Sequence, residues 1–441
     1  MLNAPPVLQS AEEDELFAKI SRRLLPFLFL LYVVSYLDRV NVSFAGASMR
    51  ADLAARGLNE QVFGAAGGIF FLGYFLFEVP SNLILQRVGA RKWIARIMLS
   101  WGIVATAMAL VRGPKSFYGM RFVLGLAEAG FFPGMILYLT FWYPAARRGR
   151  AVAIFMTATA ISGVIGALIS TAILRLDGIS GLHGWQWLFI LEGLPAIILS
   201  AVVFWILPDG PGNAHWLTQR DRELLADLFS RERAGSSHHV GDLLKAVVHP
   251  RLWLLTSVYF CIALGMYCVT IWLPDLLAAA WTGQAKWHYT LLSAIPYAVA
   301  AIGMVLVGRN SDRTGDRRWH TVISLVVATA GAIGSASLHQ PAMTLIAFSL
   351  IALGIWSAIG PFWAMPPAFL AGTAAAGGIA LINSVGNLGS FLGPTIVGFV
   401  KQRTGSFTIA LWILAGFLAL GAVLASFIRV TRPQELHSAP Q

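Results

Sequence analysis

A short basic segment occurs twice in this sequence, first as Arg87-Val88-Gly89-Ala90-Arg91-Lys92-Trp93 and again as Arg313-Thr314-Gly315-Asp316-Arg317-Arg318-Trp319. Both copies carry Arg, Gly, Arg and Trp at matched positions, with a further basic residue before each Trp. Each copy is a short basic segment between two long apolar runs. Because a repeat at matched positions is the signature of a duplicated unit, the chain is predicted to consist of two related halves.

Apolar runs extend outward from both copies to nearly the whole chain. The sequence is 57% hydrophobic and only 12% charged, and a run of about 20 apolar residues crosses the roughly 30 Å of a bilayer's hydrocarbon. Such runs lie near 24–46, 62–85, 93–112, 116–142, 148–174 and 186–207, then near 251–279, 288–308, 319–338, 342–362, 377–400 and 406–428. The sequence therefore predicts an all-α membrane protein with twelve transmembrane helices in two six-helix pseudo-repeats.

The domain boundaries follow from this pattern. We expect an N-terminal tail (1–23), an N-terminal six-helix bundle (24–207), a linker (208–249), a C-terminal six-helix bundle (250–428) and a C-terminal tail (429–441). Lys and Arg concentrate in alternate loops, and the positive-inside rule then places the tails and the linker in the cytoplasm. The net charge of +11 is thereby explained by membrane topology, so no nucleic-acid partner is expected.

Several motifs resemble the major facilitator superfamily and, within it, the anion:cation symporter family. They are the repeated basic loop, continued as 308–318, and four stretches of the first half: 36–41, 78–82 with 89–91, 121–129 and 187–195. The resemblance is strongest to bacterial transporters of tartrate, phthalate and hydroxyphenylacetate. It implies a secondary transporter of a small organic acid anion in the inner membrane. The sugar-acid branch carries a Gln in helix 5, and the stretch 155–163 has none.

Charged residues inside the predicted helices indicate where the chemistry lies. Asp38 and Arg39 fall in helix 1, and Arg121 and Glu128 fall in helix 4, two turns apart on one face. A charged group at the centre of a membrane helix costs roughly 2.5–3.5 kcal/mol on insertion scales, so it is retained for pairing, coupling or a substrate path. The four groups form one cluster if both faces turn inward.

The functional interpretation assigns substrate binding to the arginines and proton coupling to the acids. A guanidinium stays charged and grips a carboxylate through two parallel hydrogen bonds. Asp38 and Glu128 would pair with the arginines when ionised and release them to the anion when protonated. The resemblance implies the same roles for Arg121, Asp38 and Glu128. The structural alternative is a pair of salt bridges that hold helices 1 and 4 together, and Asp38 and Arg39 could instead serve gating.

Polar and aromatic residues add further candidate substrate contacts. Tyr36 and Tyr74 each share a helix face with a charged neighbour, Arg39 or Glu78. Asn383 and Asn387 lie one turn apart in helix 11, and the resemblance implies that Asn387 meets substrate. Trp363 lies beside prolines and could stack on a flat substrate. Alternatively, the tyrosines and asparagines only make hydrogen bonds within the bundle, and Trp363 only occupies the membrane interface, where Trp is common.

The repeated loop is interpreted as a gate, because charge pairs at the membrane surface can latch one access state and break in the other. The gating candidates are Arg87, Gly89, Arg91, Asp312, Arg313 and Arg317.

Rival functions are less favoured. No lysine follows the glycine pattern of an ATP-binding loop, and no residues show catalytic or metal-ligand spacing, so neither an enzyme nor a cofactor is expected. The predicted function is a monomeric proton symporter that imports a small organic acid anion such as tartrate or an aromatic carboxylate. An anion exchanger, a sugar-acid symporter and a non-transporting nutrient sensor remain alternatives.

Overall fold

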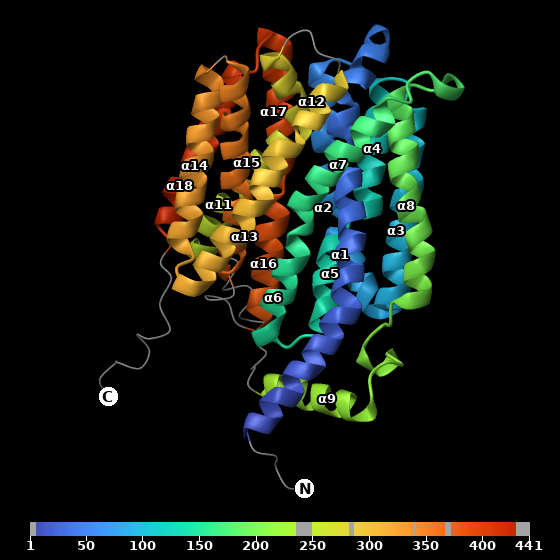
Figure 1. Cartoon of the computed structure of the whole chain (residues 1–441), viewed down its shortest axis with the longest axis vertical. Coiled ribbons are helices and arrows are strands. Elements are labelled where there is room, and N and C mark those ends of the chain that lie inside the picture. Colours follow the sequence, from blue (N-terminus) through green and yellow to red (C-terminus); the bar gives the residue numbers. More distant parts are fainter. Residues whose placement is uncertain (1–5, 235–248, 282–285, 339, 367–371, 429–441) are drawn as a thin grey trace. The chain divides into compact units, whose positions relative to one another are not determined.

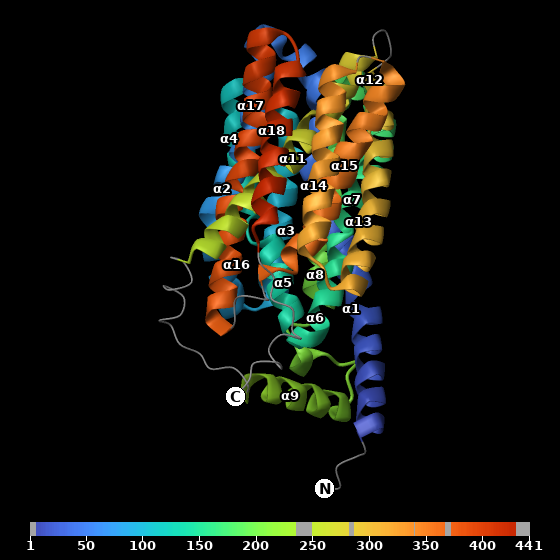
Figure 2. The same ribbon diagram turned by 90° about the vertical axis from the view of Figure 1, so that its left-hand side faces the viewer.

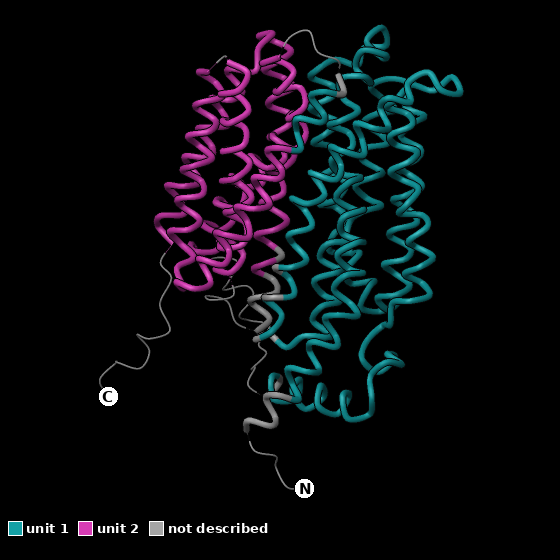
Figure 3. Tube along the Cα trace, viewed as in Figure 1, with its two compact units in different colours: residues 1–237, 285–294 teal, residues 238–284, 295–441 magenta. Residues whose placement is uncertain are grey.

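A computed structural model describes residues 6–234, 249–281, 286–338, 340–366 and 372–428. These residues form helices joined by short turns, and the chain divides into two compact units (Figure 3). Unit 1 comprises residues 1–237 and 285–294, and unit 2 comprises residues 238–284 and 295–441. Among the described residues, 11 helices are long and apolar enough to cross a membrane.

Unit 1 is a helical bundle with one helix across its end. Its α-helices are α1 (Pro6–Asp52), α2 (Glu60–Val88), α3 (Ala90–Ala107), α4 (Pro114–Glu128), α5 (Phe131–Thr140), α6 (Ala145–Met156), α7 (Ala158–Leu174), α8 (Gly184–Ile206), α9 (Gln219–Ala234) and α12 (Lys286–Leu292). Short 3-10 turns are η1 (Ala54–Arg56), η2 (Met108–Leu110), η3 (Ile179–Gly181) and η4 (Pro211–Asn213). Helix α2 packs on α4, α3 on α8, and α1 on both α7 and α8.

Unit 2 is a second bundle. It contains α11 (Pro250–Ala280), α13 (Ala294–Thr314), α14 (Arg318–Ser337), α15 (Pro341–Trp363), α16 (Gly372–Gly386), α17 (Leu388–Thr404) and α18 (Thr408–Ser426). Helix α11 lies against α15, α16, α17 and α18, and its central residues are almost all buried. It is therefore the core helix of this unit.

Four of the expected spans are interrupted. Breaks at Ala129-Gly130, Thr157, Ser293 and Asn387 divide the runs 116–142, 148–174, 288–308 and 377–400 into two helices each. Among the described residues, the first three of these runs each count as one candidate span, and the run 377–400, made of α16 and α17, does not. Thr157 and Asn387 both interrupt the fifth span of their half, so the interruption itself repeats.

Helix α1 begins at Pro6, well before the apolar run that starts near Leu24. Its early residues pair with α9, which lies across the end of the unit 1 helices beside the start of α1 (Figures 1 and 2). Lys19 Nζ lies 2.7 Å from Asp221 Oδ2, and Arg220 Nη2 lies 3.0 Å from Glu12 Oε2. The predicted linker thus contains a helix, α9, docked on α1.

Candidate functional site

An ion pair joins α1 to α4 in the interior of unit 1. Arg39 Nε donates to Glu128 Oε1 at 2.5 Å, and Ser35 Oγ donates to the same oxygen at 2.9 Å. Glu128 is 1% exposed and Arg39 9% exposed. Both charges are therefore shielded from water, where an ion pair is held by its geometry and hydrogen bonds rather than by solvation.

Arg121 lies close to this pair but bonds differently. Its Nε and Nη2 donate to the backbone oxygens of Ala66 and Gly67 at 3.3 and 3.4 Å. These helix carbonyls are weak partners for a charged group, and Nη1 is buried with no hydrogen-bond partner. A buried guanidinium with an unused donor is suited to receive an anionic group.

The ring of Phe70 stands between the two arginines. The guanidinium carbon of Arg121 lies 4.9 Å from the ring centroid, and that of Arg39 lies 5.9 Å from it. Arg39 also lies 5.2 Å from the centroid of Tyr74 and hydrogen-bonds its hydroxyl. Tyr36, which is 1% exposed, packs edge-on against Tyr32. The structure thus brings Arg39, Arg121, Glu128 and Tyr74 together around an aromatic ring that sequence reasoning did not select.

Glycines bring α4 close enough to α2 for these contacts. A Cβ on Gly125 would lie 2.0 Å from the backbone oxygen of Phe70, so only glycine fits there. Helix α4 ends at Glu128, and Gly130 follows with φ +88°, a conformation that L side chains rarely adopt. The end of α4 that carries Glu128 is therefore set by a turn in the middle of the apolar run.

Asp38 faces away from this group. Trp101 Nε1 of α3 donates to Asp38 Oδ2 at 2.8 Å, and Asn41 Nδ2 donates to Oδ1 at 3.3 Å. Consecutive residues on an α-helix point about 100° apart, so Asp38 and Arg39 contact different neighbours. The four charged groups expected in one cluster are thus divided: Glu128 pairs with Arg39, and Asp38 has no arginine partner among the described residues.

The candidates of unit 2 lie at two of its helix ends. Asn383 is buried in α16, and Asn387 stands at the break before α17, where its backbone N–H donates to the oxygen of Asn383 at 2.9 Å. Trp363, the last residue of α15, packs edge-on against Tyr259 with ring centroids 4.8 Å apart. Asn387 keeps helical dihedral angles, with φ −63° and ψ −14°, so its backbone stays hydrogen-bonded at the interruption.

The first copy of the repeated loop is held by a residue that the sequence analysis missed. Asp209 Oδ1 accepts from the backbone N–H of Arg91 at 2.9 Å, at the start of α3. Gly89 has φ +97°, and a Cβ there would lie 2.7 Å from Asp209 Oδ1. Arg91 Nε lies 3.8 Å from Asp209 Oδ2, whereas Arg87 is exposed.

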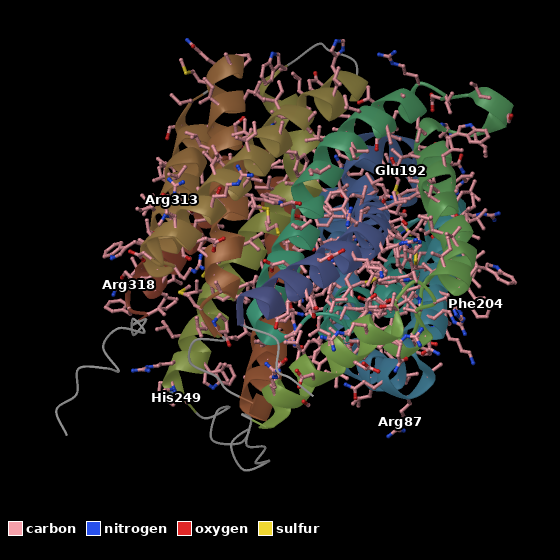
Figure 4. The ribbon with its side chains drawn as sticks, turned by 60° about the horizontal axis from the view of Figure 1, so that its bottom comes forward. Arg87, Glu192, Phe204, His249, Arg313 and Arg318 are labelled. Atoms are coloured by element: carbon pink, nitrogen blue, oxygen red, sulfur yellow. The ribbon has the colours of Figure 1, made fainter. Side chains whose placement is uncertain are left out.

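The second copy pairs within itself. Arg317 Nη1 donates to Asp312 Oδ1 at 2.5 Å and to Ser311 Oγ at 3.1 Å. Asp312 and Arg313 are both exposed. Figure 4 shows Arg313 and Arg318 at the outer side of their helices, and Arg87 at the edge of unit 1.

Sequence reasoning also passed over a buried acid. Glu192 of α8 is 4% exposed, and Ser170 Oγ of α7 donates to its Oε1 at 2.6 Å. The rule that selected Glu128, a charge within an apolar run, applies equally to Glu192. Asp209 and Trp101 gave no comparable signal, because a loop aspartate and an apolar tryptophan acquire their roles only through tertiary contacts.

Comparison with known proteins establishes the family. The model of the Major Facilitator Superfamily matches residues 28–394. The chain belongs to the major facilitator superfamily. It is therefore a multi-pass membrane protein, a secondary transporter with a small-molecule substrate.

The similar proteins named here match nearly its whole length. It is 45% identical to a "putative tartrate transporter" of Agrobacterium vitis, over 97% of this chain and 94% of that protein. It is 41% identical to the "putative metabolite transport protein NicT" of Pseudomonas putida, over 96% of this chain and 95% of that protein. The fold is also that of the inward-open xylose transporter XylE of E. coli, with a TM-score of 0.74, 15% identity, and coverage of 93% and 97%.

Proposed function

We propose that this facilitator is a proton-coupled symporter that takes up a small organic acid anion, such as tartrate or an aromatic carboxylate. One observation carries the proposal: the buried Arg39–Glu128 pair lies beside Arg121, whose Nη1 has no partner. The 45% identity to the Agrobacterium vitis protein supports the substrate class. The proposed setting is the inner membrane, with both termini and the linker in the cytoplasm and the chain acting as a monomer.

The coupling follows from competition for Arg39. While Glu128 is ionised, its Oε1 accepts from Arg39 and the guanidinium is engaged. Protonation removes the negative charge, which weakens the charge-assisted hydrogen bond and frees Arg39 for a substrate carboxylate. Arg121 offers its spare Nη1–H to the same anion, with Tyr74 and Tyr36 as further donors. Proton uptake would then raise anion affinity, and Asp38 would serve as a second proton carrier.

The remaining candidates complete the alternating-access cycle. The two bundles (24–207 and 250–428), joined by the linker (208–249), would expose the bound anion first to one side of the membrane and then to the other. Asn383, Asn387 and Trp363 are proposed as further substrate contacts. The loop residues would gate access through pairs such as Asp312–Arg317, and this gating set is Arg87, Gly89, Arg91, Asp312, Arg313 and Arg317.

Uptake into proteoliposomes across an imposed pH gradient tests the proposal, with tartrate, phthalate, 4-hydroxyphenylacetate and galactonate as the panel. A gradient that is acidic outside should drive accumulation of one of these acids. Glu128→Gln should bind the anion but fail to concentrate it, because the amide cannot exchange a proton. Uphill accumulation by Glu128→Gln would refute the coupling role.

Arg121→Lys tests the binding role. A lysine keeps the positive charge but loses the planar fork that grips a carboxylate, so affinity for the favoured acid should fall by about tenfold or more. Unchanged affinity would remove Arg121 from the site. Galactonate as the favoured substrate would point to the sugar-acid alternative, and uptake that requires internal anion but no pH gradient would point to exchange.

A further inference from the structure

A second buried network in unit 1 holds two acids. Asp38 of α1 and Glu192 of α8 are 1% and 4% exposed. Trp101 donates to Asp38 at 2.8 Å, and Ser170 donates to Glu192 at 2.6 Å. Figure 4 shows Glu192 among the helices of unit 1, away from the outward-pointing Arg87. The negative charge of nearby Glu128 also acts on Asp38, so this network feels the Arg39–Glu128 pair electrostatically.

Asn41 connects the two acids. Its Nδ2 donates to Asp38 Oδ1 at 3.3 Å, and the same side chain hydrogen-bonds Glu192. A carboxamide has two N–H groups and one C=O, so it can donate to a carboxylate and accept from a carboxylic acid. Asn41 can therefore serve a neighbouring acid in either protonation state, whereas Glu192 Oε2 is buried with no hydrogen-bond partner and is free to carry the proton.

Neither acid has a basic partner among the described residues. The elements packed on α8 are α1, α3, α7 and η2. Helix α1 presents Asp38 and Asn41, α3 presents Trp101, and α7 presents Ser170. The turn η2 has no titratable side chain. Arg39 turns instead to Glu128. A buried ion without a counter-charge costs several kcal/mol, and a second like charge beside it adds to that cost.

We infer that Asp38 and Glu192 together bind one proton across Asn41, and that Glu192 sets the pH at which Asp38 gains or loses it. Binding adds H⁺ from water to a carboxylate oxygen and gives one carboxylic acid beside one carboxylate. Release leaves two carboxylates facing each other, so loss of the proton brings a like-charge repulsion that either acid alone would not feel. Glu192 is thus a positioning residue for the proposed coupling acid, and the inference rests on the proposed function only in that respect.

Infrared spectroscopy of the purified, full-length protein in lipid tests this without substrate. The carboxylic-acid C=O band would be followed over stepped pH in wild type, Glu192→Gln and Asn41→Ala. Glu192→Gln removes the like charge, so the band of Asp38 should titrate about one pH unit lower or more. Asn41→Ala keeps both acids but removes a donor to their ionised forms, so the midpoint should move to higher pH. Glu78→Gln, which removes another buried glutamate, should leave the midpoint unchanged.

Glu192→Gln and Asn41→Ala can each refute the inference alone, so the test still works if one of them fails to fold. An Asp38 band with the same midpoint in wild type and Glu192→Gln would show that the acids titrate independently, and the inference would fall. An unchanged midpoint in Asn41→Ala would have the same meaning. Because no pH gradient or anion is present, these outcomes are independent of the uptake assay that tests the symport proposal.

Discussion

Replacement of Gly125 by alanine should damage the binding site through the backbone. The added Cβ would lie 2.0 Å from the backbone oxygen of Phe70, 2.9 Å from its carbonyl carbon and 3.0 Å from the backbone nitrogen of Tyr74. No side-chain rotation relieves a clash with backbone atoms. To reach the 3.4 Å of ordinary contact, α2 and α4 must separate locally by about 1.4 Å.

The consequence has two parts. Overpacking of this kind costs about 1–3 kcal/mol in stability. The displacement also moves Phe70 and Tyr74, which contact Arg39 and Arg121, so anion affinity should fall about tenfold, or about 1.4 kcal/mol. Thermal unfolding in detergent and the concentration dependence of proteoliposome uptake measure these effects.

A matched control lies on the same helix. Gly119 of α4 has nothing within 4 Å of its added Cβ, so Gly119→Ala changes the same residue type on the same helix without a clash. It should unfold and transport like wild type. If Gly125→Ala were as stable and as active as Gly119→Ala, the close approach of α2 and α4 would not position the site, and the reasoning would be wrong.

Two further predictions concern the end of unit 1 where α9 lies. Asp209→Ala removes the acceptor at the start of α3 and should lower the free energy of unfolding by about 0.5–2 kcal/mol, as loss of a helix cap does. Asp227→Ala, which breaks an exposed ion pair with Arg231 on α9, should cost less than about 1 kcal/mol. Equal losses in chemical denaturation would argue against the cap. Burial alone would raise the pKa of Asp221, but hydrogen bonds from Lys19 and Thr218 hold it below its ordinary value of about 3.9. An acid whose pKa is lowered in the folded protein stabilises that protein at pH values above the acid's ordinary pKa. This stabilisation is lost as the pH falls through the lowered pKa. Protection of α9 amides from hydrogen exchange should therefore be constant at neutral pH and weaken only below about pH 4, and weakening near pH 6 would contradict the role of Asp221.

The sequence predicted the membrane architecture because that information is local. Hydropathy and the repeated basic loop depend on runs of residues, and the family comparison confirmed the twelve-helix class. The breaks at Gly130 and Asn387 were not predicted, because a hydropathy average does not register a single turn within an apolar run. Docking of α9 on α1 was also missed, since it depends on pairs such as Lys19–Asp221 that are far apart in sequence.

The sequence could indicate which charged residues to consider for the site, but not the direction in which each of their side chains points. Charge within an apolar run selected Asp38, Arg39, Arg121 and Glu128, and all four are buried. Their grouping required knowing which neighbour each one faces. Phe70 carries no charge and lay outside the rule altogether, although its ring contacts both arginines.

The adjacency of Asp38 and Arg39 gives α1 a role that neither residue has alone. Arg39 ties α1 to α4 through Glu128, and Asp38 ties it to α3 through Trp101. Because one peptide unit joins the two residues, a rotation of α1 that draws Arg39 toward an anion must also move Asp38 against its hydrogen-bond partners. Events at the anion site would thus reach the Asp38–Glu192 pair through the helix itself, with no further relay between the two networks.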